Sequence, residues 1–346
     1  MREPESLCGL TADEVLSLIE PSGFRYSHAT LVTNCIYKKR IRDINHLPGI
    51  SNKLRNLLSG SHVPGISSPE QSLESVDGSK KYLFRSRSGL LYETVYIPDG
   101  KRHTVCVSVQ SGCRMGCKLC ATARYGFHGN LTAGEMVNQV IGIPEAHLVT
   151  HVVFMGMGEP LDNTGEVFRA CSIMTAEWGL SLSPANITVS TVGITAEVEN
   201  FLRSSECNLT LSLFSPFPDE RILYIPAERN HPSGKILEII RSFPARKRRR
   251  MSVAYVMIKG LNDTDSHLDG LKSLLAGSSV RVNLLPYHAT GDSGFVSSSE
   301  ERMMYFKHSL VISGISASVR KTRGADIHAA CGLLASGLAD YKRKAY

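Results

Sequence analysis

The sequence predicts an α/β chain in which a small helical module precedes a partial parallel barrel of six strand–helix units. Apolar residues recur with helical spacing over residues 11–60, and six strand-like apolar runs then alternate with helical stretches up to about residue 320. This number of repeats suits a partial (β/α)6 TIM-like barrel better than a two-domain nucleotide fold. In such barrels the active site lies at the carboxyl ends of the strands.

The amino-terminal module is expected to contain short helices. Thr11 is a suitable N-cap for residues 12–20, residues 28–39 have helical spacing, and a third helix ends at Gly60. A basic cluster in this module is either solvated or faces a phosphate backbone; it consists of Lys38, Lys39, Arg40 and Arg42.

A Ser/Pro/Gly-rich linker at about residues 60–80 is expected to lead into antiparallel strands. Three alternating stretches with turn residues between them predict these strands, at residues 81–87, 90–98 and 103–109. The chain therefore divides into a helical accessory module, a linker with a β lead-in, and a barrel that carries a C-terminal segment, with expected bounds of 1–62, 63–98 and 99–346.

The six apolar runs predict the parallel strands of the barrel. They are residues 105–109, 151–156, 186–191, 208–214, 252–258 and 280–286. Because helical stretches separate them, neighbouring strands are expected to pair in parallel.

Composition and charge narrow the class of protein. Apolar residues make up 42% and charged residues 21% of the chain, which excludes disorder over most of its length. The net charge of +7 favours either a polyanionic partner or a merely basic surface. No apolar run has the length of a signal peptide or a membrane span, so a cytoplasmic protein without membrane contact is expected.

The nine cysteines are odd in number and scattered, except for one tight group. This pattern argues against a secreted disulfide framework and for a reducing compartment in which a few thiols perform chemistry. The tight group is Cys113, Cys117 and Cys120, with C-x3-C-x2-C spacing directly after the run 105–109. Three thiolates on one loop can hold three irons of a [4Fe–4S] cluster and leave the fourth iron open.

Other metal sites fit this loop less well. A structural zinc site needs four closing ligands, and the nearby candidates are His103, Cys106 and His128. An electron-transfer cluster would need a fourth cysteine close by. An open iron can instead chelate the amino and carboxylate groups of S-adenosylmethionine (SAM), whose one-electron cleavage gives a 5′-deoxyadenosyl radical. At this loop the chain resembles the radical-SAM superfamily, of which C-x3-C-x2-C spacing is the recognised mark.

Polar residues near the strand ends are candidate SAM contacts. In MGMGEP (155–160), Gly156 and Gly158 permit close backbone approach and Glu159 could accept a hydrogen bond from the SAM ammonium group. Ser190, Ser212 and Asn283 lie in or end apolar strands, where an unpaired polar group would cost about 1–3 kcal/mol. Each could instead bond to the backbone.

The chain resembles the radical-SAM adenine methyltransferases of 23S ribosomal RNA and transfer RNA, the RlmN/Cfr family. The resemblance covers about residues 26–335 and rests on the stretches ETVYIP, VCVSVQSGCRMGCKLCATA, FMGMGEP, STVGI, NLTLSL, VNLLPY and VRKTRGADIHAACG. It implies an enzyme that methylates an adenine ring carbon in one or both RNAs, with a [4Fe–4S] cluster and SAM as cofactors. It also implies RNA and an electron donor such as flavodoxin or ferredoxin as partners; a monomer is expected.

The resemblance assigns roles to individual residues. Cys331 matches the cysteine that carries the methyl group, Cys106 the resolving cysteine and Glu93 the proton acceptor. The family's SAM contacts match Gly158, Glu159, Ser190, Ser212, Leu213, Phe214 and Asn283. Its mechanism implies that a methylene group on Cys331 adds to the ring and that attack by Cys106 then releases the product and leaves a disulfide. The target base must leave its RNA stack to reach these cysteines.

The chain departs from the family pattern at three places. Phe214 stands where the family usually has histidine, His328 stands where it usually has aspartate, and the segment after Asn283 lacks the usual asparagine-proline start. KTRGAD (321–326) resembles the enzymes that methylate C2, which is the preferred position, whereas NLTLSLFSPF (208–217) leans toward the C8 enzymes. A radical-SAM enzyme of another purpose and an inactive RNA-binding relative are the rival interpretations.

The basic run ARKRRR (245–250) precedes the fifth barrel strand. Five adjacent cations are commonly a solvated loop, but in an RNA enzyme they favour a phosphate contact.

Overall fold

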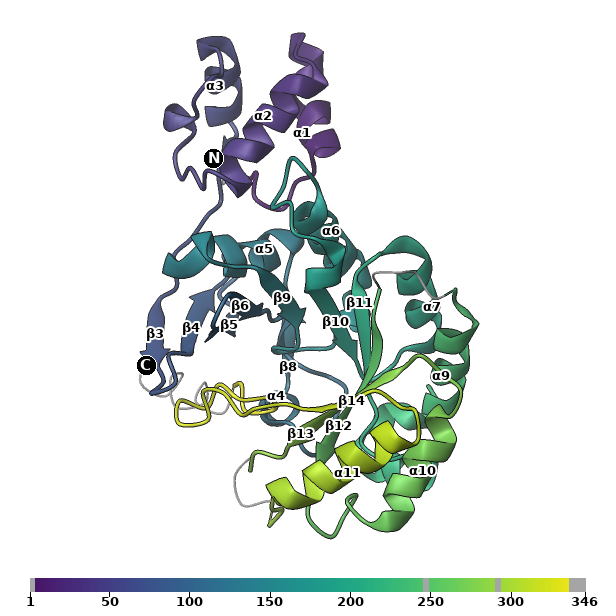
Figure 1. Ribbon diagram of the computed structural model, residues 1–346. Helices are drawn as coiled ribbons and strands as arrows, with labels where there is room; N and C mark the ends of the chain where they lie inside the picture. Colours follow the sequence, from purple (N-terminus) through teal and green to yellow (C-terminus); the bar gives the residue numbers. More distant parts are fainter. Residues whose placement is uncertain (1–3, 245–248, 290–293, 336–346) are drawn as a thin grey trace.

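A ten-stranded sheet organises the computed structural model of the chain, which describes residues 4–244, 249–289 and 294–335 (Figure 1). The strands follow the order β14-β13-β12-β11-β10-β9-β6-β5-β4-β3. Their bounds in that order are Ala317–Val319, Arg281–Pro286, Met251–Met257, Asn208–Ser212, Ile187–Thr191, His151–Phe154, Arg102–Cys106, Leu91–Asp99, Lys80–Arg85 and Gln71–Glu74.

The parallel part of the sheet confirms the predicted α/β barrel and extends it by one strand. Six predicted strands appear as β6 and β9–β13, and β14 pairs in parallel with β13. The sequence analysis missed β14 because it has only three residues, none of them fully buried, so it lacks an apolar run.

The antiparallel strands β3, β4 and β5 continue the same sheet beyond β6. The predicted linker at residues 60–80 is therefore partly wrong, because Gln71–Glu74 forms the exposed edge strand β3. A second correction concerns the stretch before the cysteine loop. The strand β6 ends at Cys106, and Gln110–Gly112 (β7) pairs separately with Phe127–Asn130 (β8).

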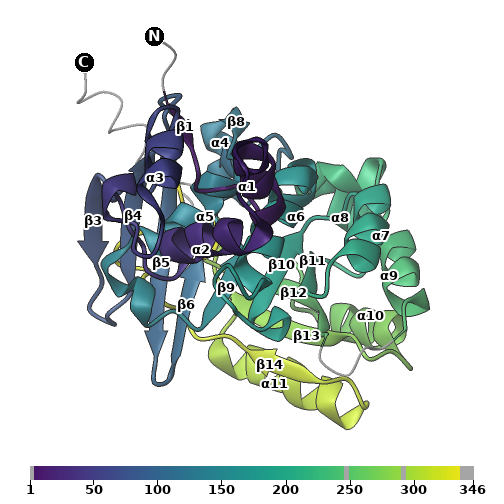
Figure 2. The same ribbon diagram turned by 90° about the horizontal axis from the view of Figure 1, so that it is seen from above.

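Helices cover the outer face of the parallel strands (Figures 1 and 2). They are α5 Ala133–Ile141, α6 Thr164–Thr175, α7 Thr195–Ser204, α9 Ser233–Ser242, α10 Asp265–Leu275 and α11 Glu300–Ile312. Two shorter helices, α4 (Ala121–Tyr125) and α8 (Pro218–Tyr224), lie in the connections. Single 3-10 turns are η1 Glu20–Ser22, η2 Ile44–His46, η3 Pro144–His147, η4 Pro160–Asp162, η5 Pro184–Asn186 and η6 Pro226–Arg229.

Strand alternation separates an apolar outer face from a more polar inner face. In β12, Val253, Tyr255 and Met257 are fully buried in the main core beneath the helices. Ser252 and Ala254 alternate with them and point the other way. The hydrophobic core that stabilises the fold thus lies between the sheet and the outer helices. The inner face of the sheet can therefore carry polar groups.

The helical module contains α1 (Ala12–Ile19), α2 (Tyr26–Tyr37) and α3 (Asn52–Ser59), as predicted. Thr11 and Glu14 form a capping box at the start of α1, a motif that stabilises a helix by about 1 kcal/mol. Two short parallel strands close the module, β1 (Glu5–Ser6) and β2 (His62–Val63). An ion pair of 2.6 Å between Arg169 of α6 and Glu14 links the module to the barrel.

Candidate active site

The strand register places the predicted site residues on one face of the sheet. Ser212 lies beside Ala254, Ala254 beside Asn283, and Asn283 beside Ser318, so they form one row across four strands. Ser190 pairs with Thr210, which is two residues before Ser212 and therefore faces the same way.

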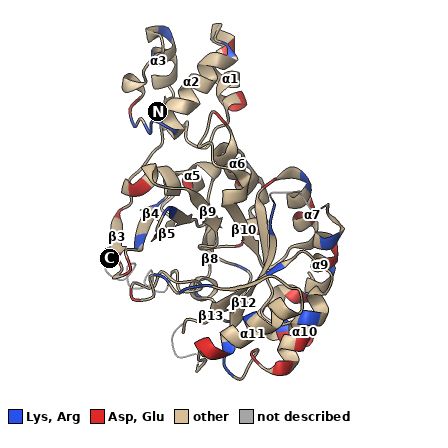
Figure 3. Ribbon diagram, viewed as in Figure 1, with Lys and Arg blue, Asp and Glu red and all other residues tan. Residues whose placement is uncertain are grey.

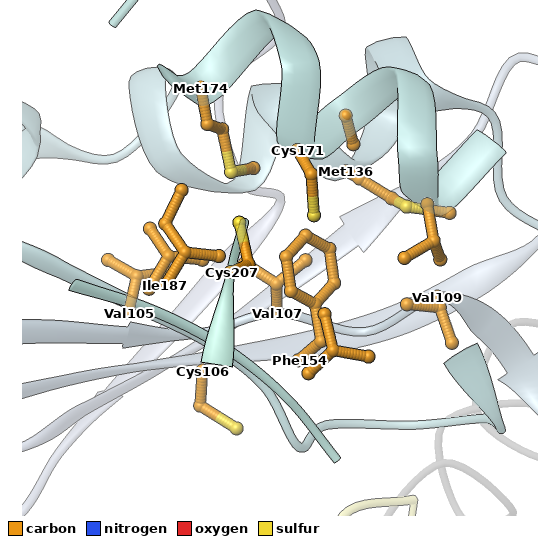
Figure 4. Close-up of a cluster of buried hydrophobic side chains, with 14 of the residues drawn as sticks. Val105, Cys106, Val107, Val109, Met136, Phe154, Cys171, Met174, Ile187 and Cys207 are labelled. Carbon is orange, nitrogen blue, oxygen red and sulfur yellow. The ribbon is translucent and has the colours of Figure 1, made fainter. Parts of the chain in front are cut away.

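The same face continues through the other half of the sheet. Cys106 pairs with Val153 of β9 on one side and with Val95 of β5 on the other. Glu93 is two residues from Val95, so it also faces inward. Figure 4 shows the alternation at β6: Val105 and Val107 point into the core with Met136 and Met174, whereas Cys106 points the opposite way.

The segment after β14 returns across the barrel and brings Cys331 to this face. Four contacts hold its first half: Arg323 Nη2 to Asp99 Oδ1 (3.0 Å), the Gly324 N–H to Asp77 Oδ2 (2.9 Å), Ser75 Oγ to Asp326 Oδ1 (2.6 Å) and the Val76 N–H to Asp326 Oδ2 (3.2 Å). Figure 1 shows this yellow segment passing beneath the carboxyl ends of the strands.

Three further contacts fix the second half of this segment beside the cysteine loop. The Ala121 N–H donates to Gly332 O (2.8 Å), and Thr122 Oγ1 donates to Leu334 O (3.0 Å). The Ala335 N–H donates to Glu93 Oε2 (2.7 Å). Cys331 is therefore held from two sides, by α4 and by β5.

Cys331 and Cys106 lie near enough for the charge of one thiolate to affect the other thiol. Burial raises the pKa of Cys106, and the repulsion of a Cys331 thiolate raises it further, against a backbone hydrogen bond at Met155. The Cys331 side chain is open to solvent, yet enough protein surrounds it for desolvation to raise its pKa; Arg320 opposes this effect. The strand register and the anchored C-terminal segment thus bring residues separated by 225 positions in the sequence (331 − 106) to the same face of the sheet.

The loop of Cys113, Cys117 and Cys120 lies at the same place. Burial raises the pKa of Cys113 to about 12, with contributions from Cys120 and Glu159. Burial also raises the pKa of Cys117, as do Cys120 and Cys113, whereas Arg221 lowers it. A Cys120 thiolate in turn raises the pKa of Cys331. The three loop thiols and the Cys331 thiol therefore form one electrostatic group.

The donor set of this loop fits an iron–sulfur cluster. Three half-buried thiols whose charged forms repel one another are costly to ionise without a cationic group between them. Among residues 4–244, 249–289 and 294–335, no three His, Cys, Asp or Glu side chains group closely enough for a single metal ion. In a cubane cluster each thiolate binds a different iron, so the three thiols need not lie as close together as the ligands of a single metal ion.

The loop is also held rigidly. The Cys113 N–H donates to Gly126 O (3.1 Å), and the Lys118 N–H donates to Tyr224 O of α8 (3.0 Å). Gly112 has φ +79°, and a Cβ there would lie 1.5 Å from Gly126 O, so only glycine fits before the first thiol.

The glycines of MGMGEP serve the backbone packing of the site. A Cβ on Gly156 would lie 2.6 Å from Ser108 Oγ, and one on Gly158 would lie 2.5 Å from Gln110 Cβ. The close approach predicted at these glycines is therefore an approach to residues 108–110. Their role toward a ligand stays a prediction.

The carboxylate of Glu159 is buried and caps two neighbouring segments. Oε1 accepts the Leu161 N–H (3.0 Å) and Oε2 accepts the Val192 N–H (2.9 Å). Burial raises its pKa to about 7, although hydrogen bonds from Thr191, Val192 and Leu161 oppose the shift. Glu159 thus links the residue that follows β10 to the segment 159–161. Its remaining lone pairs would be the ones that accept an ammonium group.

This shift predicts that the cluster-free protein loses stability as the pH rises from about 4.5 to about 7. In that interval the unfolded carboxyl group has lost its proton, while the folded one retains it. The free energy of unfolding should then fall by up to about 1.4 kcal/mol per pH unit from this group. Urea unfolding at several pH values measures the slope, and Glu159→Gln should flatten it; equal slopes in both proteins would contradict the prediction.

The remaining predicted SAM contacts lie at the strand ends. Ser190 and Ser212 are half-buried, and neither hydroxyl has a hydrogen-bond partner within the part of the chain that the structure describes. Asn283 Oδ1 accepts Ser318 Oγ at 3.1 Å. Leu213 is fully buried on the outer face.

Phe214, at a family histidine position, has an unusual conformation. Its φ is +66°, and its carbonyl accepts Asn262 Nδ2 at 2.8 Å. The ring packs 4.8 Å from that of Tyr224, in an apolar cluster with Ile225 and Tyr287. The other substituted position, His328, also has positive φ (+52°). A positive φ is uncommon for a bulky residue such as phenylalanine, so the backbone at Phe214 is strained, whereas histidine, like asparagine and aspartate, adopts this conformation more readily.

Glu93 is almost fully buried and has two partners. Its Oε1 lies 3.0 Å from Lys81 Nζ, and its Oε2 accepts the Ala335 N–H. Sequence reasoning missed Lys81, since a lysine in an alternating strand is normally solvent-exposed. It also missed the fully buried Arg221 of α8, the helix whose Tyr224 carbonyl accepts the Lys118 N–H; the motif analysis gave no signal for it.

No helix in the described part of the chain is both long and apolar enough to cross a membrane.

Comparisons with known proteins show which family the chain is similar to. The model of the Radical SAM superfamily matches residues 107–270. A "Probable dual-specificity RNA methyltransferase RlmN" of Parabacteroides distasonis is 39% identical over 97% of this chain and 98% of its own length. The "Dual-specificity RNA methyltransferase RlmN" of Halorhodospira halophila is 33% identical, with 97% and 95% covered. The crystal structure of a radical SAM methyltransferase from Sphaerobacter thermophilus superposes with a TM-score of 0.88 at 35% identity, covering 96% of this chain and 100% of that one.

Proposed function

Because the chain belongs to the RlmN family of radical SAM RNA methyltransferases, we propose that it methylates a ring carbon of adenine in RNA, with C2 the expected position. The observation that carries this proposal is the placement of Cys331 beside the Cys113–Cys117–Cys120 loop, fixed by the hydrogen bond from Ala121 to Gly332, on the face of the sheet to which Cys106 also belongs. A radical SAM enzyme that only cleaves SAM needs the loop and has no use for the other two thiols.

We further propose that Cys113, Cys117 and Cys120 hold a [4Fe–4S] cluster and that SAM lies between it and the inner face of the barrel. When bound, the cluster supplies the electron that cleaves SAM and generates the 5′-deoxyadenosyl radical. The half-buried hydroxyls of Ser190 and Ser212 support this placement, because they face inward and have no hydrogen-bond partner among the described residues. Gly158, Glu159, Leu213, Phe214 and Asn283 would complete the SAM contacts at the strand ends.

The two cysteines would then act in sequence. Cys331 accepts a methyl group from one SAM. Removal of a hydrogen atom from this S-methyl group gives a methylene radical, whose carbon then forms a bond to the adenine ring. A base would remove the ring proton, and one electron would leave the adduct for a one-electron acceptor, a role that the oxidised cluster would supply. Cys106 attacks Cys331 Sγ, the bond from this sulfur to the methylene carbon breaks, and a proton completes the new methyl group. The resulting disulfide is reduced by two electrons from an external donor of the flavodoxin or ferredoxin type.

Glu93 would be the proton acceptor in this scheme. Its position on the inner face, joined to the Cys331 segment through Ala335, supports a role near the reacting ring. Its Oε1 lies 3.0 Å from Lys81 Nζ, so the carboxylate is held in place from the β4 side as well.

The helical module 1–62 is proposed as an accessory RNA-binding part, the stretch 63–98 as the linker and β lead-in, and 99–346 as the catalytic barrel. The module projects from one end of the barrel in Figure 1, and its Lys38, Lys39 and Arg42 are exposed. Figure 3 shows Lys and Arg on both the module and the outer helices.

Mass spectrometry of nucleosides tests the function. RNA lacking the modification is incubated with the reconstituted protein, SAM and a reductant, and digested. A new 2-methyladenosine in ribosomal or transfer RNA supports the proposal, and 8-methyladenosine would assign the C8 reaction that residues 208–217 resemble. SAM cleavage without any methylated adenosine would instead favour a radical SAM enzyme of another purpose.

The basic run at residues 245–250 requires a narrower experiment than the sequence suggested. Arg249 donates to Leu202 O (2.8 Å) and Cys207 O (3.1 Å), so it supports the fold. Residues 246–248 lie outside the described residues. The run adjoins a cavity of about 730 Å³ at the amino ends of β12 and β13, opposite the candidate active site; its arginines are Arg241, Arg249, Arg250 and Arg281.

We expect charge reversal at Arg246, Lys247 and Arg248 to weaken RNA binding and flatten its salt dependence. Each lost phosphate contact should reduce the slope of log affinity against log salt by about 0.7 to 0.9. Titrations at several salt concentrations measure this slope, with reversal of Lys38, Lys39 and Arg42 as the comparison. An unchanged slope would assign the run to a solvated loop.

A further inference from the structure

The buried guanidinium of Arg221 contacts the strand ends that are proposed to bind SAM, and its helix supports the cysteine loop. Arg221 is fully buried at the middle of α8. Its Nη2 donates to Val192 O (2.7 Å) and Ser212 O (2.9 Å), and its Nε donates to Leu213 O (2.9 Å). One side chain therefore holds the carbonyls at the carboxyl ends of β10 and β11.

These strand ends carry the proposed SAM contacts. Val192 is held from both sides, since its N–H donates to Glu159 Oε2 while its carbonyl accepts from Arg221. The carbonyls of Ser212 and Leu213 accept hydrogen bonds from Arg221. The Ser212 hydroxyl takes no part in this contact and faces the barrel interior. The guanidinium thus fixes the backbone from outside the site.

The helix of Arg221 also supports the cysteine loop. The Lys118 N–H donates to Tyr224 O of α8. Cys117 packs against an apolar cluster that includes Ile225 and Phe214. Arg221 lies three residues before Tyr224 on the same short helix, so its buried cation is close to the loop at Cys117.

Glu228 balances this cation. Its Oε2 accepts Arg221 Nη1, and the two carboxylate oxygens accept the Ser233 N–H at 3.0 and 2.9 Å. Glu228 is 4% exposed, so the pair is almost completely shielded from water. A buried pair of this kind is costly to form, and removing one partner leaves an uncompensated charge.

We propose that Arg221 is a positioning residue that clamps the SAM-binding strand ends and whose positive charge raises the reduction potential of the cluster held by Cys117. The proposal rests on the proposed function, because it requires a cluster on the loop. Reduction adds one negative charge to the cluster, and a buried cation nearby stabilises that charge more than water-exposed groups can. Glu228 has the opposite charge, so it opposes this effect.

Three variants separate the charge of Arg221 from its hydrogen bonds. Arg221→Gln removes the charge, Arg221→Lys keeps the charge but lacks the planar fork that reaches three carbonyls, and Glu228→Gln leaves the cation less compensated. The matched control is Arg229→Gln, since Arg229 is exposed on the adjoining turn. Each reconstituted protein is assayed for bound iron, for its reduction potential by a titration monitored by electron paramagnetic resonance, and for its Kd for SAM.

We expect Arg221→Gln to lower the reduction potential and Glu228→Gln to raise it. A tenfold lower ratio of reduced to oxidised cluster at a fixed potential corresponds to about 59 mV. Arg221→Lys should keep the potential near that of the wild type but weaken SAM binding by about tenfold, as for the loss of one good interaction. Arg229→Gln should change neither.

Shifts of equal sign in Arg221→Gln and Glu228→Gln, or no shift in either, would overturn the electrostatic part, since a purely structural role predicts no opposite signs. If Arg221→Gln does not fold, Glu228→Gln and Arg221→Lys still decide the matter. Unaltered SAM affinity in Arg221→Lys would overturn the clamp. Wild-type protein that takes up no iron would overturn the proposed function itself, which is a distinct result.

Discussion

Replacing Cys106 with alanine should trap the protein covalently on its RNA. The variant retains Cys331 and the cysteine loop, so the methylene group can still form its bond to adenine. Without the Cys106 thiol, nothing attacks Cys331 Sγ, and the thioether between protein and RNA persists. Denaturing gels should show a band of higher mass that nuclease treatment returns to the size of the free protein, and peptide mass spectrometry should place the adduct on Cys331.

The control for this experiment is the double variant Cys106→Ala with Cys331→Ala. This double variant lacks the thiol that carries the methyl group, so the covalent band should be absent. Cys171→Ala is a second control, since Cys171 is a buried thiol in the core on the other side of the sheet (Figure 4). Clean turnover by Cys106→Ala without any covalent band would mean that Cys106 is a core residue and that the proposed chemistry is wrong.

Changing Cys113, Cys117 or Cys120 to alanine should abolish the cluster and all SAM cleavage. Anaerobically reconstituted wild-type protein should bind about four irons per chain, and each single variant should lose most of this iron, because two thiolates do not hold a cubane firmly. Iron analysis, visible absorbance and quantification of 5′-deoxyadenosine measure the loss.

The matched control for the loop is Cys331→Ala, which should retain iron and SAM cleavage while forming no methylated RNA. Stoichiometric zinc without iron absorbance in the wild type would contradict the cluster assignment. Iron retained by all three loop variants would contradict it equally.

Local signals were sufficient to predict much of the fold. Thr11 caps α1 because its hydroxyl and the Glu14 carboxylate bond to backbone groups only three residues away, an interaction that the sequence displays directly. The six apolar runs became strands because helices bury their outer face. Strand β14 escaped notice since its short segment is stabilised mainly by pairing with β13, which no local pattern reveals.

The site was predictable only where motif and family resemblance identified residues. Spacing suggested the cysteine loop, and resemblance linked Cys106 with Cys331. The partners of Glu93 could not be foreseen, because Lys81 and Ala335 reach it through strand pairing and through the return of a distant segment. Arg221 was hidden for the same reason: its acceptors are carbonyls, which every residue possesses.

The return of the segment after β14 also has a kinetic consequence. Its anchors join residues that are very far apart in the chain: Ser75 and Asp326 are separated by 251 positions, and Glu93 and Ala335 by 242. Closing loops of this size carries a high entropic cost before any contact compensates for it, so such contacts form late in folding. The chain has a single tryptophan, Trp178, whose ring lies 6.2 Å from that of Tyr37 at the junction with the helical module. During refolding, tryptophan fluorescence should therefore recover before Cys331 reaches Cys106, and for an interval the protein should be largely folded yet unable to form the disulfide between them.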